Sequence, residues 1–110
     1  MIKEDQIFEN NIIRIGGNAE DNDKIVAEAK QTDYWFHLAN LPSCHVIISV
    51  DKNNPITKQM IKYCAYLVKE NTKYKNFKEV VVNYTLIKNV KRTKEKGKVI
   101  LIGKVEKISV

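Results

Sequence analysis

The apolar residues of this chain fall mostly into short runs that alternate with polar residues or are rich in β-branched side chains. Such runs, bounded by Asn, Gly and Pro, are typical of β-strands. The strands predicted in this way are residues 6–9, 12–15, 32–38, 45–50, 80–87, 99–102 and 105–110. The Asn10-Asn11 pair favours a tight hairpin between the first two strands, and residues 40–43 favour a second hairpin between the next two.

Two further stretches have the spacing of amphipathic helices. A short helix is expected to begin at Asn18 or Asp21, with carboxylates in its first turn. A longer helix is expected to be capped by Asn54, with Pro55 at its first position. Its apolar stripe comprises Ile56, Met60, Ile61, Cys64, Ala65, Leu67 and Val68. The order of elements predicts an α+β fold, a mostly antiparallel β-sheet packed by one long and one short helix.

The length and composition fit one globular domain that spans residues 1–110. A chain of 110 residues with 44% hydrophobic side chains can bury a core without disulfides or metals. No apolar run approaches the ~18 residues of a membrane span, so no membrane association is expected. Two cysteines and an N-terminus without signal-peptide character indicate reduced thiols and a cytoplasmic location.

The net charge of +6 is concentrated in the second half of the chain. Residues 1–55 carry 5 basic and 9 acidic side chains, whereas residues 56–110 carry 14 basic and 4 acidic ones. Such an asymmetry favours a basic surface for a polyanion, most simply a nucleic acid. The alternative is a lysine-rich solvated face with no specific partner.

The predicted strand at residues 32–38 holds an unusual row of side chains. Because side chains on a strand alternate between faces, Asp33, Trp35 and His37 share one face. His45, on the next strand, would approach His37 across the hairpin. An indole can stack on an unpaired base and an imidazole can donate to phosphate, so this row is a candidate nucleic-acid contact. The alternative is structural, with Trp35 packed in the core and His37 bonded to a neighbouring group.

A basic arm follows the strand at residues 80–87. Its eleven residues from Lys88 to Lys98 hold six basic side chains and one acidic one. Continued alternation would place Lys88 and Arg92 on one face. The candidate phosphate contacts are Lys88, Lys91, Arg92, Lys94, Lys96 and Lys98, with Arg14 as a further candidate. The alternative is a solvated hairpin tip that protects an edge strand from aggregation.

The residues offer little for metal binding or catalysis. The soft ligands His37, Cys44, His45 and Cys64 match no zinc spacing, so no metal site and no cofactor are expected. Cys44 with a histidine could form a thiol nucleophile pair, but no phosphate-cradling glycine loop accompanies it. A binding protein is therefore favoured over an enzyme.

Five ordered blocks of the sequence resemble the NFACT-R domain over roughly residues 12–110. The blocks are Gly17-Asn18-Ala19, Asn22-Asp23, Asp33-Tyr34-Trp35-Phe36-His37, Pro42-Ser43-Cys44-His45-Val46-Ile47-Ile48, and Val82-Asn83-Tyr84-Thr85 with Val90-Lys91-Arg92 and Gly97-Lys98-Val99. The chain departs from the family where Pro42-Ser43-Cys44-His45 replaces the frequent Pro-Gly-Ser-His.

The resemblance implies an RNA-binding domain of the kind found in ribosome quality-control factors. It points to structured RNA, tRNA or rRNA, in a translation, quality-control or tRNA-modification context. A stand-alone animal relative is associated with DNA, so DNA is an alternative ligand. The rival hypothesis is a module that docks on a protein partner, such as an RNA-modifying enzyme or ribosomal protein, through the Trp35 face. A third hypothesis is an enzyme that uses His37 and Cys44.

Overall fold

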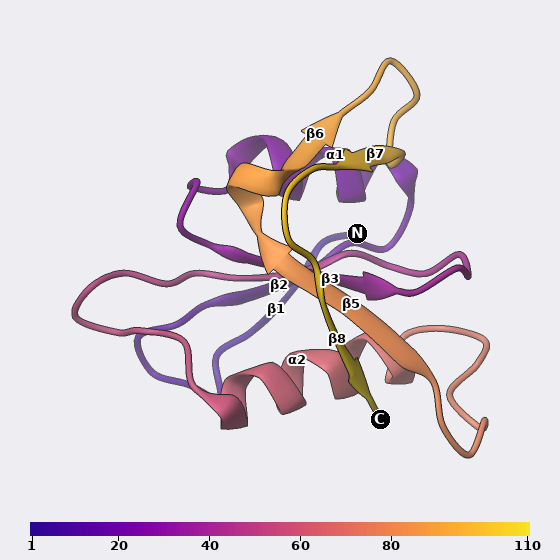
Figure 1. Ribbon diagram of the computed structural model, residues 1–110, viewed down its shortest axis with the longest axis horizontal. Coiled ribbons are helices and arrows are strands. Elements are labelled where there is room, and N and C mark those ends of the chain that lie inside the picture. The colour runs from indigo at the N-terminus through magenta and orange to yellow at the C-terminus, as the bar shows by residue number, and fades with distance from the viewer.

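The computed structural model describes all residues from Met1 to Val110 and is built on one six-stranded antiparallel sheet. The strand order in this sheet is β1-β2-β4-β3-β5-β8 (Figure 1). The strands are β1 (Lys3–Asp5), β2 (Ile13–Ile15), β3 (Tyr34–Leu38), β4 (Val46–Ile48), β5 (Val81–Leu86) and β8 (Glu106–Ser109). Together with the two helices described next, this sheet confirms the predicted α+β fold class.

Two helices flank the sheet, and both begin at a side-chain cap. Helix α1 (Ala19–Glu28) starts after Asn18, whose side chain accepts a hydrogen bond from the amide of Asp21. Helix α2 (Lys58–Glu70) starts after Thr57, which accepts from the amide of Met60. The prediction of Asn54 as the cap of α2 is wrong, because Asn54 instead pairs with Asp51 in a turn.

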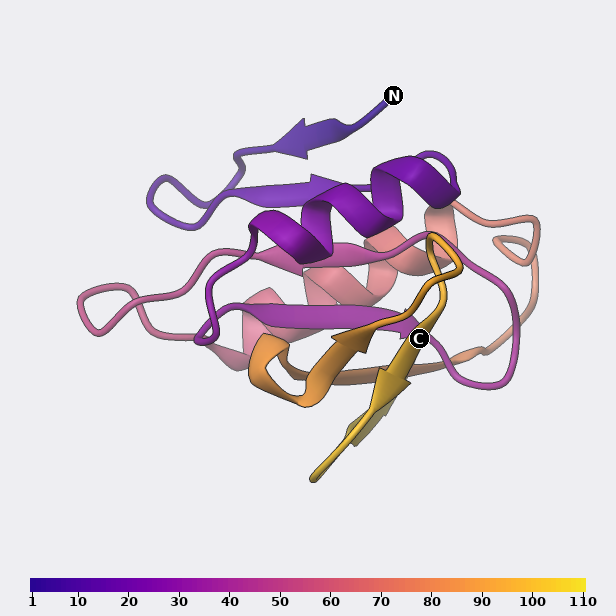
Figure 2. The same cartoon turned by 90° about the horizontal axis from the view of Figure 1, so that it is seen from above.

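The two helices cover opposite faces of the sheet, so the molecule has two apolar cores (Figure 2). The larger core lies between the sheet and α2 and includes Phe36, Val46 and Val68. The smaller core lies on the face covered by α1, and it includes Trp35 and Ile87. Side chains that alternate along β3 therefore enter different cores, as the period of a strand requires.

The predicted long strand at residues 80–87 does not continue into the basic arm. After β5 the chain forms a single 3-10 turn, η1 (Ile87–Asn89), which turns it out of the six-stranded sheet. It then forms a separate two-stranded hairpin of β6 (Val90–Arg92) and β7 (Val99–Leu101). The prediction that Lys88 and Arg92 share a face of one continuing strand is therefore wrong.

The first predicted hairpin is also placed differently. Residues 6–9 form no strand; the antiparallel partner of β2 is the polar segment Lys3–Asp5. Asn11 is buried, and its side-chain amide donates to the carbonyls of Ser49 and Asn54 at 2.9 Å each. This buried amide therefore ties the segment before β2 to the segment that follows β4.

The hairpin of β3 and β4 forms as predicted, with Tyr34 opposite Ile48 and Phe36 opposite Val46. On its other side β3 pairs with β5, which places His37 opposite Asn83. The strand β3 is therefore central and brings residues from both halves of the chain side by side. Neither helix has the length and apolar character that crossing a membrane would require.

Candidate nucleic-acid interface

Trp35 is a core residue, 2% exposed, and it packs with Ile25, Val26 and Ile47. An indole at this depth cannot stack on a base, so the contact hypothesis is wrong for Trp35 and the packing alternative holds. Asp33 is likewise buried, and its carboxylate accepts from the amides of Lys30 and Val50. Its observed role is to hold the start of β3.

A hydrogen bond joins Trp35 to His45, whose ring lies in a cleft beside the β6–β7 hairpin. The Trp35 Nε1–H group donates to Nδ1 of His45 at 3.1 Å, so the proton of His45 resides on Nε2. The ring of His45 lies near the backbone of Gly97, on the loop of the hairpin, and both residues line the same cleft. Burial, reinforced by the proximity of His37, lowers the pKa of His45 to about 3. His45 is therefore uncharged at neutral pH.

The β6–β7 hairpin is held against the start of α1 by two further contacts. Arg92 donates from Nε and Nη2 to the two carboxylate oxygens of Asp23 at 3.0 and 2.9 Å. The hydrogen bond from Arg92 lowers the pKa of Asp23 below its usual value. Gly97 has a φ of +83°, and a Cβ at this position would lie 3.1 Å from the Cα of Ala19. The hairpin tip thus depends on a glycine for its approach to α1.

The basic side chains of the arm are divided by these contacts. Lys91, Lys94, Lys96 and Lys98 are exposed on the hairpin. Arg92 is paired with Asp23, and its charge is thereby neutralised. Lys88 lies on η1, where its amide donates to the carbonyl of Gln31, away from the hairpin tip. The arm therefore places three lysines, Lys94, Lys96 and Lys98, at or beside the tip.

Arg14 lies on the same face of the sheet as Trp35 but at a distance from this hairpin. Its Nη1 group donates to Glu28 at 2.7 Å, and its Nε lies 3.8 Å from Glu4. These carboxylates neutralise the guanidinium, and the cleft beside it is lined by Ile25 and Asp33 rather than by other bases. The structure does not bring Arg14 together with the lysines of the tip.

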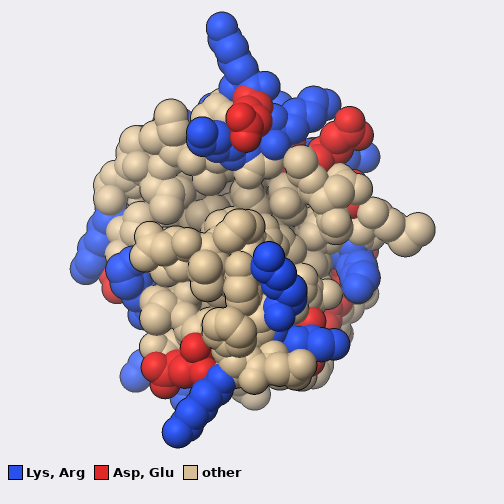
Figure 3. All heavy atoms as spheres, turned by 90° about the vertical axis from the view of Figure 1, so that its right-hand side faces the viewer, with Lys and Arg blue, Asp and Glu red and all other residues tan.

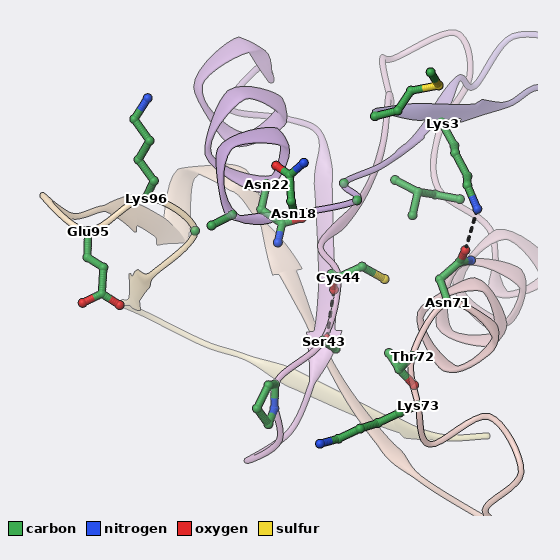
Figure 4. Close-up of a pocket in the computed structure, with 17 residues that line it drawn as sticks. Lys3, Asn18, Asn22, Ser43, Cys44, Asn71, Thr72, Lys73, Glu95 and Lys96 are labelled. Atoms are coloured by element: carbon green, nitrogen blue, oxygen red, sulfur yellow. Dashed lines mark hydrogen bonds between the residues drawn. The ribbon is translucent and has the colours of Figure 1, made fainter.

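A cleft of about 810 Å³, here called the lysine cleft, opens beside the hairpin tip (Figure 4). Lys3 comes from β1, Lys73 from the loop after α2, and Lys96 from the hairpin tip. Between them lie Asn18 and Asn22 at the start of α1. The carboxamide oxygen of Asn22 accepts from the amide of His45, which leaves its NH2 group as a donor. Lysines from three separate segments thus surround a polar floor.

Lysine and arginine side chains surround the face that contains this cleft. Figure 3 shows Lys and Arg side chains around a centre that carries little charge, with fewer acidic side chains between them. Glu95 is the acidic side chain that lines the lysine cleft itself. An open, basic, concave surface of this kind suits a phosphate backbone more than a small ligand.

A second cleft of about 530 Å³, here called the histidine cleft, adjoins the first at Pro42, Ser43 and Gly97. Its floor includes the rings of His37 and His45, whose centroids are 5.0 Å apart. This confirms the expectation that the two histidines meet across the β3–β4 hairpin. The remaining lining residues are Trp35, Leu38, Asn40, Leu41, Asn83, Lys98, Val99 and Leu101.

His37 is half-buried and has a defined protonation pattern. Its Nδ1 atom lies 2.7 Å from the carbonyl oxygen of Leu38, which can only accept, so Nδ1 carries the proton. Burial lowers the pKa of His37, although the Leu38 carbonyl partly opposes this effect. At neutral pH the ring is therefore uncharged, with Nε2 as a hydrogen-bond acceptor.

The geometry gives no support to a thiol nucleophile. Burial raises the pKa of Cys44 to about 11, and its thiol lies 3.9 Å from the carbonyl of Val68 on α2. Burial also raises the pKa of Cys64, which packs in the larger core. No cluster of three or more His, Cys, Asp or Glu side chains that could hold a metal ion is present.

Comparison with known proteins identifies the family. The model of the NFACT protein RNA-binding domain matches residues 5–107, nearly the whole chain. The chain belongs to the NFACT RNA-binding domain family. This confirms the resemblance seen in the sequence. The family is a nucleic-acid-binding one rather than a catalytic one, and RNA is the kind of partner that its description names.

Relatives of this NFACT domain include coiled-coil domain-containing protein 25 from Mus musculus and from Bos taurus. Each is 32% identical over 85 residues, which cover 74% of this chain and 41% of the relative. The structure of the C-terminal part of the fibronectin/fibrinogen-binding protein from Streptococcus suis aligns with a TM-score of 0.80 at 25% identity. That alignment covers 92% of this chain and 41% of the other. The chain thus spans less than half the length of these relatives.

Three residues that line the two clefts were missed by sequence reasoning. Lys3 and Lys73 each lie far from the basic arm in sequence, and only the fold brings them to Lys96. Asn83 lies in a β-prone run, where a polar residue between Val82 and Tyr84 is the one signal that it faces solvent or a ligand. Its position opposite His37 depends on strand order, which no local pattern reveals.

Proposed function

We propose that this domain binds structured RNA, tRNA or rRNA, through the lysine cleft and the adjoining hairpin tip. The observation that carries the proposal is that Lys3, Lys73 and Lys96, from three separate segments, all line one cleft. In Figure 4 Lys3 reaches Asn71, and Lys96 extends outward from the hairpin loop. Lys94 and Lys98 extend the positive charge along the hairpin. Lysines distributed over an open surface can contact several phosphates of a folded backbone, and such contacts carry no sequence information.

The role that fits this binding is accessory and non-catalytic. The proposed setting is cytoplasmic translation, ribosome quality control or tRNA modification, where an RNA-binding domain positions a substrate for a larger partner. DNA presents the same phosphate charge as RNA, so a DNA duplex is the natural competitor to test. A difference in affinity between RNA and the DNA duplex would come from the A-form geometry and the 2′-hydroxyl groups of RNA.

Fluorescence anisotropy of labelled tRNA, and of a DNA duplex of matched length, tests this proposal at low and physiological salt. Tighter binding of tRNA, with an affinity that falls steeply as salt rises, is expected. The triple variant Lys3→Gln, Lys73→Gln, Lys96→Gln should flatten the salt slope by about one unit per lysine. Absence of salt-dependent binding to tRNA would refute the proposal.

A matched control separates this cleft from general positive charge. Lys52, Lys58 and Lys62 are exposed on the β4–α2 loop and on α2. Replacing all three with Gln changes the net charge by the same amount as the triple variant above. The proposal expects this control to keep nearly the full salt slope, because long-range charge is screened at physiological salt.

An exposed apolar groove favours protein docking as a second candidate function. Leu41, Phe77 and Val81 are 37%, 53% and 39% exposed and line a groove of about 560 Å³. A partner would therefore bind here rather than at the buried Trp35. A complex that resists both nuclease and high salt, and that Phe77→Ser weakens, would favour this candidate over RNA binding.

A further inference from the structure

Polar groups from three neighbouring strands form one row that begins in the histidine cleft. The pairing of β3 with β5 sets His37 opposite Asn83, and the pairing of β5 with β8 sets Asn83 opposite Lys107. Lys107 donates from Nζ to the Oδ1 atom of Asn83 at 2.8 Å. All three lie on the face of the sheet that carries Trp35, beyond the part that α1 covers.

The two groups at the centre of this row have opposite hydrogen-bonding capacity. The contact with the Leu38 carbonyl leaves His37 Nε2 as an acceptor. The bond from Lys107 occupies the oxygen of Asn83, so its NH2 group remains as the donor. An acceptor and a donor at adjacent cross-strand positions match the edge of a nucleobase, where donors and acceptors also stand side by side.

The walls of the cleft suit the flat, weakly polar faces of a base. Leu41 and Pro42 of the loop between β3 and β4, and Val99 and Leu101 of the hairpin, contribute apolar lining. The volume of about 530 Å³ lies within the range of small-ligand pockets. Lys98 is exposed at the margin of the cleft, where it can contact the phosphate of the same nucleotide.

We propose that the histidine cleft receives a single unpaired nucleobase of the RNA whose backbone crosses the lysine cleft. His37 accepts from the base, Asn83 donates to it, and Lys98 contacts its phosphate. The proposal rests on the RNA-binding function above and adds a preference for unpaired nucleotides. The two clefts share Pro42, Ser43 and Gly97, so one strand can pass from one to the other.

The test compares a short single-stranded RNA with the same strand in which the central nucleotides lack their bases. Both strands carry the same phosphates, so phosphate contacts alone would bind them equally. Anisotropy titrations of the whole domain are expected to show about tenfold tighter binding of the strand with bases. Equal binding of the two strands would overturn the base pocket while leaving phosphate binding in place.

Two variants assign the preference to this cleft. Asn83→Asp keeps the side-chain shape and the oxygen that holds Lys107 but removes the donor, and His37→Phe keeps a planar ring but removes the acceptor. Each should reduce the tenfold preference to nearly one. Asn53→Asp, on an exposed loop beyond the opposite ends of β3 and β4, makes the same charge change as Asn83→Asp and should keep the preference.

Circular dichroism and Trp35 fluorescence establish that each variant is folded before binding is compared. If the folded variants retain the preference for the strand with bases, the base is recognised elsewhere and the proposal is wrong. If the wild-type domain binds tRNA but neither strand at low salt, the base pocket is wrong and the proposed RNA-binding function stands; if it binds neither strand nor tRNA, both are wrong.

Discussion

The indole nitrogen of Trp35 donates a hydrogen bond to Nδ1 of His45 at 3.1 Å, and both side chains are 2% exposed. This bond fixes the tautomer of His45, with the proton on Nε2. Trp35 and His45 therefore lie beneath the proposed RNA surface. Trp35 supports the cleft beside the basic hairpin and does not contact the ligand itself, whereas His37 of the same strand lines that cleft.

Trp35 fluorescence should report a buried indole that RNA does not reach. Because Trp35 is the one tryptophan of the chain and is 2% exposed, its emission should be blue-shifted and resist acrylamide quenching. Saturation with tRNA should change the quenching constant little. Strong quenching by acrylamide that tRNA prevents would show instead that Trp35 is exposed and lies on the binding surface.

Stability should fall as the pH is lowered from 7 to 5. His45 binds its proton at a pKa of about 3 in the folded protein and at about 6.5 when unfolded. Between these values the unfolded chain holds the extra proton, so acid favours unfolding. The free energy of unfolding should drop by up to about 2 kcal/mol over this interval from His45 alone. The lowered pKa of His37 acts in the same direction.

Urea denaturation at several pH values measures this dependence, and His45→Gln provides its control. Asp23, whose pKa is lowered by Arg92, loses its contribution only well below pH 5, so it does not obscure the histidine effect. The variant should be less stable at pH 7 yet lose less stability between pH 7 and 5. Parallel pH profiles for the variant and the wild type would show that His45 is not buried in its neutral form.

Gly97→Ala should weaken RNA binding beyond its effect on stability. The φ of +83° and the contact with Ala19 both disfavour a Cβ, at a cost of about 1–2 kcal/mol for the backbone alone. Gly103→Ala is the matched control, because Gly103 has a φ of +69° but lies beside Asn89, away from the tip. Thermal unfolding should show lower stability for both variants, whereas anisotropy should show weaker tRNA binding only for Gly97→Ala. Equal losses of binding would contradict a specific role for the tip.

Arg92 and Lys96 should differ in their effect on the salt dependence of RNA binding. Arg92 is already paired with Asp23, so it releases no counterion from RNA, whereas Lys96 is free to contact phosphate. Lys96→Gln should lower the slope of log affinity against log salt by about one. Arg92→Gln should leave that slope nearly unchanged. A reduced slope for Arg92→Gln would mean that the ion pair opens when RNA binds.

The strongly patterned parts of the fold could be predicted from the sequence, whereas several boundaries could not. The apolar stripe of α2 and the short loop between β3 and β4 are local signals, and both elements form. Strand β1 is polar and is held by pairing with β2, so it has no alternation to detect. The break at η1 follows from packing of Ile87 into the smaller core, a tertiary effect.

The candidate site was also predictable only in part, because the state of its side chains depends on tertiary contacts. The lysines of the hairpin tip stand out as a local run of charge, and they are exposed. Whether a basic side chain is free to contact RNA depends on carboxylates that are distant in sequence. Asp23 forms an ion pair with Arg92, and Glu28 forms one with Arg14. Burial of Trp35 likewise depends on α1, which covers its face of the sheet.

Backbone amide NMR spectra of the labelled domain, recorded during titration with tRNA, test the central claim most directly. We expect chemical-shift changes to cluster at residues 94–98, at Lys3 and at Lys73, in and beside the lysine cleft. The start of α2 around Lys58 should remain unchanged. Shifts that cluster at the start of α2, or no shifts at all in the lysine cleft, would contradict the account.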